Sequence, residues 1–128
     1  MLLACVCACA VTSRSKETEH YDLTHCRTAI DAGDNGNIET YCKALAGDYA
    51  ADVAGETGRA RNLDLLLEGT SLGAVGYAEN LDSDDHTAGA GYFNQARDLF
   101  NEALKDANGD KWISRRAKLA LEHLPVQP

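Results

Sequence analysis

The 128-residue sequence predicts an all-α protein of about five helices packed as antiparallel pairs. Three observations support this prediction. Apolar residues recur at intervals of three and four in five stretches of the chain, as on the buried face of a helix. No stretch alternates apolar and polar residues for long enough to predict a strand. Both prolines, Pro125 and Pro128, lie at the extreme C-terminus, so neither interrupts a helix in the body of the chain.

The first ten residues, MLLACVCACA, resemble the apolar core and cleavage zone of a secretory signal peptide. The ACA run at positions 8–10 fits the small-x-small cleavage pattern, and the segment is too short to span a bilayer. The same residues also resemble a bacterial lipobox, with Cys5 or Cys9 as the lipidated residue. A buried apolar first helix or strand is the third interpretation. We expect a leader at residues 1–10 and one α-helical domain at residues 11–128.

The first two predicted helices flank the turn sequence AGDNGN. We expect helix one over residues 16–32, with Leu23, Cys26 and Ile30 on its apolar face, and a turn at residues 33–36. Helix two follows this turn. Its apolar stripe holds Ile38, Tyr41, Cys42, Leu45 and Tyr49. Each helix therefore has an apolar face, and the turn folds one face onto the other.

Cys26 and Cys42 lie symmetrically about the turn, eight residues before and eight residues after Asp34. An antiparallel helix pair closed at this turn brings the two thiols together, so we predict a disulfide between them. Cleavage after Ala10 would leave only these two cysteines. Because disulfides form in oxidising compartments, the pair predicts export to the periplasm or the cell exterior. Two free buried thiols are the alternative.

Helix three is predicted over residues 60–80, after a loop at residues 55–58. It contains Gly69, Gly73 and Gly76, each of which weakens a helix by up to about 1 kcal/mol relative to Ala. Their i, i+4, i+7 spacing places them on one side, where a neighbouring helix could approach closely. A break near Gly69 is the competing interpretation.

The polar stretch at residues 81–90 predicts a long surface loop. Helix four, at residues 92–108, has the most regular apolar stripe, formed by Ala96, Leu99, Phe100, Ala103, Leu104 and Ala107. Gly109 ends this helix. Helix five follows at residues 110–124 and is stopped by Pro125. Its inward residues are Ile113, Ala117, Ala120, Leu121 and Leu124.

The segment GYFNQARDLFNEAL at residues 91–104 resembles the second helix of a tetratricopeptide (TPR) repeat. The residues in the family's register are Gly91, Phe93, Ala96, Phe100, Ala103 and Leu104. Upstream, Leu72-Gly73 and Tyr77 resemble first-helix residues, but about eleven residues too early for the family's period. An insertion in the 81–90 loop would account for that difference.

The first helical hairpin resembles a second, more degenerate TPR unit. Tyr41, Ala44 and Leu45 fit the end of its second helix, whereas Asn37 stands where the family has Ala. TPR proteins are protein-binding scaffolds, so the resemblance implies that role for this chain. An ordinary small helical bundle is the alternative fold.

The net charge and the motifs of the chain argue against several classes of function. A net charge of −8 argues against binding to a nucleic-acid backbone. The segment DAGDNGNIE partly resembles an EF-hand calcium loop, but Gly33 and Cys42 occupy the positions of its third and twelfth residues. His20 and His25 are five residues apart, which does not place them on one helix face. We therefore expect no metal, no cofactor and no catalytic residues.

These observations predict an exported helical adaptor that binds a protein or peptide. The candidate contact residues are Asp82, Asp84 and Asp85 of the loop, with Tyr92, Phe93, Phe100 and Trp112; burial in the core is the alternative for each aromatic residue. The acidic loop predicts a partner with basic groups, and a lipid anchor would be the only membrane attachment. The second hypothesis is a small periplasmic bundle that chaperones or pilots an envelope component. The third hypothesis is a metal-dependent enzyme that uses His20, Asp22 and His25.

Overall fold

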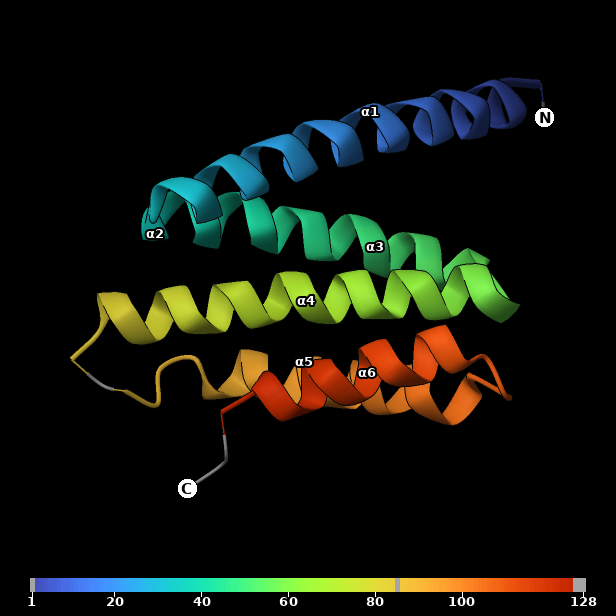
Figure 1. Ribbon diagram of the computed structural model, residues 1–128. Coiled ribbons are helices and arrows are strands. Elements are labelled where there is room, and N and C mark those ends of the chain that lie inside the picture. The colour runs from blue at the N-terminus through green and yellow to red at the C-terminus, as the bar shows by residue number, and fades with distance from the viewer. Residues whose placement is uncertain (1, 85, 126–128) are drawn as a thin grey trace.

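The computed structural model describes residues 2–84 and 86–125, with side chains from Lys16 onward. Every regular element in these ranges is helical, which confirms the all-α prediction. The elements are α1 (Leu2–Ala32), the single turn α2 (Asn35–Asn37), the π-helical turn η1 (Ile38–Cys42), α3 (Lys43–Gly55), α4 (Gly58–Asp82), α5 (Ala90–Asp106) and α6 (Lys111–His123). Consecutive long helices run side by side in opposite directions: α1, α3 and α4 form a row, and α5 and α6 cover the other side of α4 (Figure 1).

The long helices lie close to their predicted positions. Helix α4 passes through Gly69 without a break, so the competing interpretation at that residue was wrong. Helix α1 ends at Ala32 as expected but begins at Leu2, well before residue 16. Residues 2–10 of the expected leader lie in the first turns of this helix, and their side chains are outside the described part of the chain. Its cleavage or lipidation stays a prediction.

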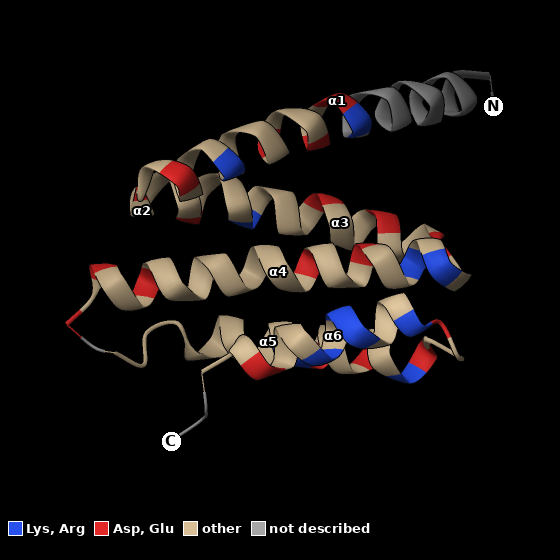
Figure 2. Ribbon diagram, in the orientation of Figure 1, with Lys and Arg blue, Asp and Glu red and all other residues tan. Residues whose placement is uncertain are grey.

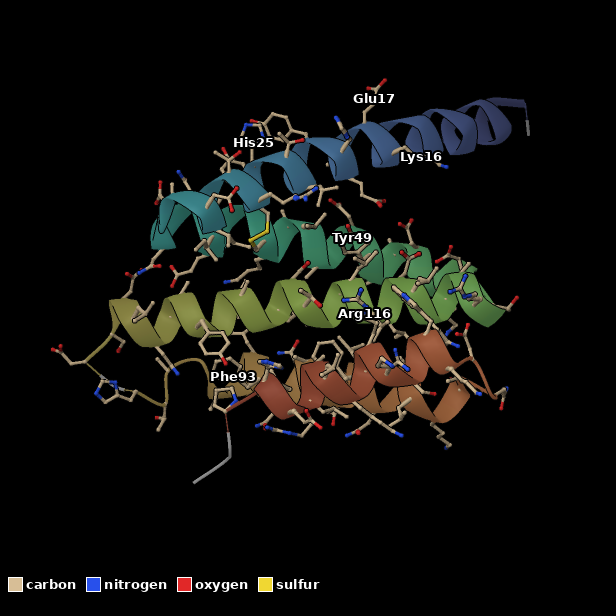
Figure 3. All side chains as sticks on the ribbon, viewed as in Figure 1. Lys16, Glu17, His25, Tyr49, Phe93 and Arg116 are labelled. Atoms are coloured by element: carbon tan, nitrogen blue, oxygen red, sulfur yellow. A yellow bond between two sulfur atoms is a disulfide. The ribbon has the colours of Figure 1, made fainter. Side chains whose placement is uncertain are left out.

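A disulfide joins α1 to the end of η1. The Sγ atoms of Cys26 and Cys42 are 2.01 Å apart and their Cα atoms 4.8 Å apart, which confirms the predicted bond (Figure 3). Gly33 ends α1 with a φ of +66°, a conformation that glycine adopts without strain. Asp34 then accepts a hydrogen bond from the backbone N–H of Asn37 at 3.2 Å and caps the next turn. The hairpin is therefore closed by a cap and a covalent bond.

The buried face of α1 includes Cys26, as predicted, but is rotated away from Ile30. Asp22, Cys26 and Ala29 are buried at an i, i+4, i+7 spacing, whereas Ile30 is 47% exposed. The prediction for Ile30 was therefore wrong. The cause is that Asp22, a polar residue, occupies the stripe that faces α3, so the apolar residues alone indicate a displaced face.

Glycines of α4 receive aromatic rings of α5. A Cβ atom at Gly69 would lie 2.7 Å from Cε1 of Phe100, and one at Gly76 would lie 2.8 Å from Cε1 of Phe93. These distances confirm that the glycine side of this helix allows close approach. Gly73 instead faces Leu124, at the end of α6. Both phenylalanines are almost completely buried, at 2% and 3% exposure.

The core consists of two apolar clusters joined through α4. One lies among α4, α5 and α6, and the other among α1, η1, α3 and α4. Half-buried Tyr92 packs against both clusters. In the described part of the chain, no helix combines the length and the apolar character needed to cross a membrane.

Candidate functional site

An apolar groove runs between α4 and α6. Its larger part is a cavity of about 560 Å³, bounded on one side by Leu67 and Tyr77 of α4 and on the other by Trp112 and Leu119 of α6. Gly69 and Gly73 lie beneath it and add no side chain to its floor. A second cavity of about 370 Å³ shares Leu66, Leu67 and Trp112 with the first and extends toward Glu56 and Asp64. We call the two together the α4–α6 groove.

Both rims of the groove expose large apolar side chains. Leu67 is 43% exposed and Tyr77 is 47% exposed on α4, while Trp112 is 48% exposed and Leu119 is 43% exposed on α6. These are four of the seven large hydrophobic residues that are exposed among the described residues. Scattered exposed apolar side chains are ordinary, but a contiguous set that borders a cavity is typical of a binding surface.

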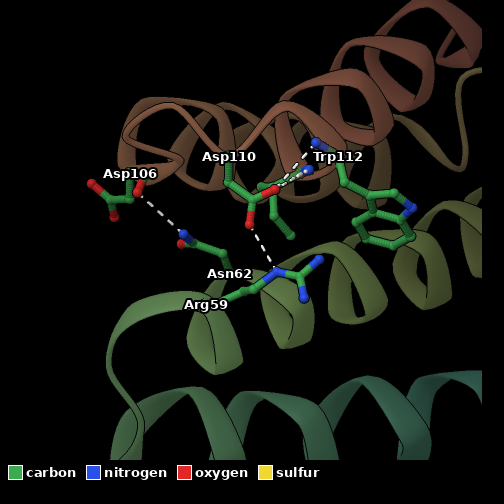
Figure 4. Close-up of polar contacts among 6 residues, drawn as sticks. Arg59, Asn62, Asp106, Asp110 and Trp112 are labelled. Atoms are coloured by element: carbon green, nitrogen blue, oxygen red, sulfur yellow. Dashed lines mark hydrogen bonds and ion pairs between the residues drawn. The ribbon is translucent and has the colours of Figure 1, made fainter.

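Trp112 is held in place at one end of the groove by the start of α6. Asp110 caps this helix by accepting hydrogen bonds from the backbone N–H groups of Trp112 and Ile113 at 3.1 and 3.2 Å. The same carboxylate accepts a 2.8 Å hydrogen bond from Nε of Arg59 on α4 (Figure 4). The hydrogen bond from Ile113 and the ion pair with Arg59 lower the pKa of Asp110 below its usual value. The helix cap and the ion pair therefore fix the backbone of Trp112, which positions its indole ring at the groove.

The guanidinium groups of Arg59 and Arg116 both lie over the Trp112 ring, 5.7 and 5.0 Å from its centroid. One comes from α4 and the other from α6, so the ring is flanked by cations from both walls. An exposed aromatic ring between two arginines resembles the composition of energetically important residues in protein interfaces, where Trp, Tyr and Arg are enriched.

The other end of the groove is braced by the chain after α6. Tyr77 donates a hydrogen bond from Oη to the carbonyl oxygen of His123 at 2.7 Å, and its ring packs edge-on against Phe93 at 4.9 Å. Arg97 of α5 donates a 2.9 Å hydrogen bond to the carbonyl oxygen of Pro125. Contacts at both ends therefore set the spacing of α4 and α6 before anything binds.

Helix α6 is basic although the chain as a whole is acidic. It carries Lys111, Arg115, Arg116 and Lys118 against one carboxylate, Glu122, whereas the net charge of the chain is −8. Figure 2 shows the resulting group of blue segments on this helix. Among the described residues, the ion pairs join Arg59 to Asp110 and Arg61 to Glu102 and Asp106, and none uses a cation of α6.

A second polar feature lies between α1, α3 and α4, where carboxyl groups face one another in pairs. The pairs that share a side-chain hydrogen bond are Glu19 with Asp52, Asp48 with Asp22, and Asp64 with Glu56. Burial, and then the hydrogen bond within each pair, raises the pKa of Glu19, Asp48 and Asp64 to about 7. Each pair therefore takes up a proton as the pH falls through about 7.

Two oxygen atoms of these pairs, Asp48 Oδ2 and Glu56 Oε1, are buried and receive no hydrogen bond from an amide, a hydroxyl group or a cation in the described chain. The described residues contain no group of three or more His, Cys, Asp or Glu side chains arranged to hold a metal ion. We therefore treat the carboxyl pairs as a determinant of stability and the α4–α6 groove as the candidate site.

The predicted contact residues do not lie together. Trp112 lines the groove, whereas Phe93 is 2% exposed and packs between α4 and α5, which agrees with the core burial given as the alternative for this ring (Figure 3). Phe100 borders the groove from below but is 3% exposed. Tyr92 lies under the ammonium group of Lys43, which is 5.2 Å from the ring centroid.

The acidic loop follows α4 and is not part of the groove lining. Asp82 accepts a 3.1 Å hydrogen bond from Nδ2 of Asn35, and Asp84 is exposed. Asp85, the third predicted loop contact, lies outside the described residues. The acidic loop therefore lies outside the α4–α6 groove. The sequence patterns did not locate this groove.

The enzyme hypothesis named His20, Asp22 and His25, and these residues make different contacts. Asp22 shares its hydrogen bond with Asp48 on α3. The ring of His25 stacks on Tyr21 at 3.9 Å and lies 4.8 Å from Tyr41. His20 contributes its backbone carbonyl to the hydroxyl group of Thr24.

Sequence reasoning missed Leu67, Leu119 and Arg116 as groove residues. The available signal was on α6, where Trp112 and Leu119 are large apolar residues outside the predicted inward stripe, next to the cations of this helix. Comparisons with protein-family models, with curated proteins and with solved structures found no match to this chain, so its function is argued from the groove.

Proposed function

We propose that the protein is an exported, non-enzymatic helical adaptor that binds a protein or peptide partner in the α4–α6 groove. The observation that carries this proposal is the preformed apolar cavity bordered by four exposed large hydrophobic residues. A site for a small molecule usually buries its apolar lining around the ligand. Here the apolar side chains stand on the rims, where a larger partner would cover them.

Two further features support an adaptor. The resemblance of residues 91–104 to a TPR second helix agrees with a scaffold of paired helices whose exposed faces bind other proteins. The contacts at both ends of the groove reduce the rearrangement that binding would require, and preorganisation of this kind favours affinity.

The proposal of export depends on the disulfide and on the leader-like first ten residues. Mapping the N-terminus of native protein tests it. We expect residues 1–10 to be removed after Ala10 or the chain to start at a lipidated Cys5 or Cys9. An intact Met1 on protein recovered from the cytosol would contradict export.

A matched pair of surface leucines tests the adaptor function. Leu119 lies on the groove rim at 43% exposure, and Leu81 is 75% exposed near the end of α4, outside the groove lining. We would capture binding proteins from an extract of the source cells with the original protein, Leu119→Ser and Leu81→Ser. We expect a specific partner to be lost with the first variant and kept with the second. Equal recovery with both variants would contradict binding in the groove.

A further inference from the structure

We infer that the α4–α6 groove takes an amphipathic helix of a partner protein, with acidic side chains along the edge that lies against α6. This inference rests on the proposed function and adds the chemistry of the partner. It depends on three observations, which are the shape of the groove, the charge of its α6 wall and the carboxylates at one end.

The shape of the groove favours a helix over an extended peptide. Its walls are two helices, whose backbone groups are hydrogen-bonded within each helix, so they offer no strand edge to an extended chain. A helix satisfies its own backbone and needs only a matching side-chain surface. At 1.5 Å per residue, the segment of α4 from Leu63 to Tyr77 is about 21 Å long, which matches roughly four turns of a partner helix.

The charge of the α6 wall favours acidic residues on the partner. Arg116 lies inside the groove over Trp112, and Arg115 and Lys118 lie beyond Leu119 on the outer side of the same helix. Arg59 and Arg61 on α4 pair with carboxylates, whereas no α6 cation forms an ion pair within the described chain. A partner with Glu or Asp beside its apolar face would meet these cations as the two helices pack.

Carboxylates at one end of the groove restrict where those acidic residues lie. Glu56 and Asp64 border the smaller cavity next to Leu63 and Leu67. An acidic side chain placed there would face like charge, which disfavours that orientation. The partner helix therefore has its acidic edge over α6 and neutral or basic residues over the α3–α4 end. This arrangement fixes which way the helix lies.

The single tryptophan of the chain reports on this site, because Trp112 is the only one and lies in the groove at 48% exposure. The probes are three synthetic amphipathic helical peptides without Trp, about sixteen residues long, with the same Leu face. Glu flanks that face in the first peptide and Lys in the second, and the third has the first peptide's residues in scrambled order. Binding is followed by the blue shift of Trp112 emission at low and at high salt.

We expect the Glu peptide to bind at least about tenfold more tightly than the Lys peptide at low salt, with the difference shrinking as salt rises. The triple variant Arg115→Gln, Arg116→Gln and Lys118→Gln, checked for helix content, should remove most of that preference. A control variant, Arg27→Gln at an exposed position of α1 outside the groove, should keep it.

The outcomes separate the two proposals. If both Leu-faced peptides shift Trp112 emission but bind equally, or if the Lys peptide binds more tightly, the acidic partner is wrong and groove binding stands. Tighter binding of the Lys peptide would instead support a partner with basic groups, as the acidic loop at residues 81–90 predicts. If neither Leu-faced peptide binds better than the scrambled peptide, groove binding by a helix fails, and with it the inference.

Discussion

The ring of Phe100 occupies the space in which a side chain on Gly69 would lie. A Cβ atom built on this glycine would be 2.7 Å from Cε1 and 2.9 Å from Cζ of the phenylalanine. Both residues border the α4–α6 groove, so this contact sets the depth of its floor as well as the packing of α4 on α5. The helix keeps a glycine here in spite of its cost to helix formation.

Replacing Gly69 tests this contact. Gly69→Ala should destabilise the protein by about 1–3 kcal/mol, because the buried ring cannot move aside without displacing its neighbours. Gly47→Ala is the matched control, since Gly47 is also inside a helix but has no atom within 4 Å of a Cβ position. That change should stabilise by up to about 1 kcal/mol. Chemical denaturation measures both, and stabilisation by the two variants alike would contradict the contact.

Removing the ring should cost more than crowding it. Phe100→Ala should lower the free energy of unfolding by about 3–5 kcal/mol, because it empties the space between α4 and α5. Asn101→Ala, on the exposed side of α5, should change it by less than about 0.5 kcal/mol. Similar losses from the two variants would show that the buried face of α5 is assigned wrongly.

The disulfide should contribute measurably to stability. It closes a loop with a sequence separation of 16 residues between Cys26 and Cys42. On the chain-entropy argument, a loop of this length stabilises the fold by about 3 kcal/mol. A double Cys→Ala variant should lose roughly that amount in denaturation. Mass spectrometry of native protein without reductant should find the two residues linked, and alkylation of both thiols would rule the bond out.

The carboxyl pairs predict that stability falls as pH rises. Glu19, Asp48 and Asp64 have pKa values near 7 in the folded chain, raised from about 4 by burial and by their paired carboxyl groups. Between these pH values the folded chain holds more protons than the unfolded chain. Linkage then makes the stabilisation complete below about pH 4 and lost as pH passes about 7.

The groups that face these carboxyl groups come from three helices and one connection: Lys16, Glu19 and Asp22 of α1, Asp48 and Asp52 of α3, Glu56 after α3, and Asp64 of α4. Lys16 alone is a cation, and it lowers the pKa of Glu19. Because the acidic groups outnumber this cation, the net effect still raises the carboxyl pKa values, and stability is still expected to fall as pH rises.

An amide at position 48 separates this effect from general charge repulsion. Asp48→Asn can donate a hydrogen bond to Asp22 at any pH, so it should raise stability at pH 8 by about 1 kcal/mol after solvent screening. Asp98→Asn, on the exposed face of α5, should have little effect. Thermal unfolding at pH 5 and pH 8 measures both. Greater stability of the original protein at pH 8 would contradict the pairing.

Most of the fold could be predicted from short sequence patterns, because helix faces, turns and helix ends depend on nearby residues. The turn at residues 33–36 and the stop at Pro125 are local signals, and the structure places a helix end close to each. The glycines of α4 are a local signal of close packing, and rings of α5 pack against Gly69 and Gly76. Cys26 and Cys42 could be paired because the turn lies midway between them. Ile30 was assigned to the buried face of α1 because Asp22 is polar and gives no apolar signal, and the burial of Asp22 depends on Asp48 of another helix.

The groove could not be predicted in the same way. Periodicity identifies the residues that turn inward on each helix, but it does not state which neighbouring helix covers them. Leu67 and Leu119 remain exposed because α4 and α6 are held apart over Gly69, Gly73 and Phe100. That spacing follows from the way both helices pack on α5, and it is a property of the assembled fold.

Site-specific cross-linking tests the central claim, that the partner binds over the α4–α6 groove, most directly. A photoreactive amino acid would replace Leu119 on the groove rim in one variant and Leu81 outside the groove in another, each produced in the source cells. We expect a discrete cross-linked species from position 119 and none from position 81. A species that forms from position 81 alone, or equally from both positions, would contradict it.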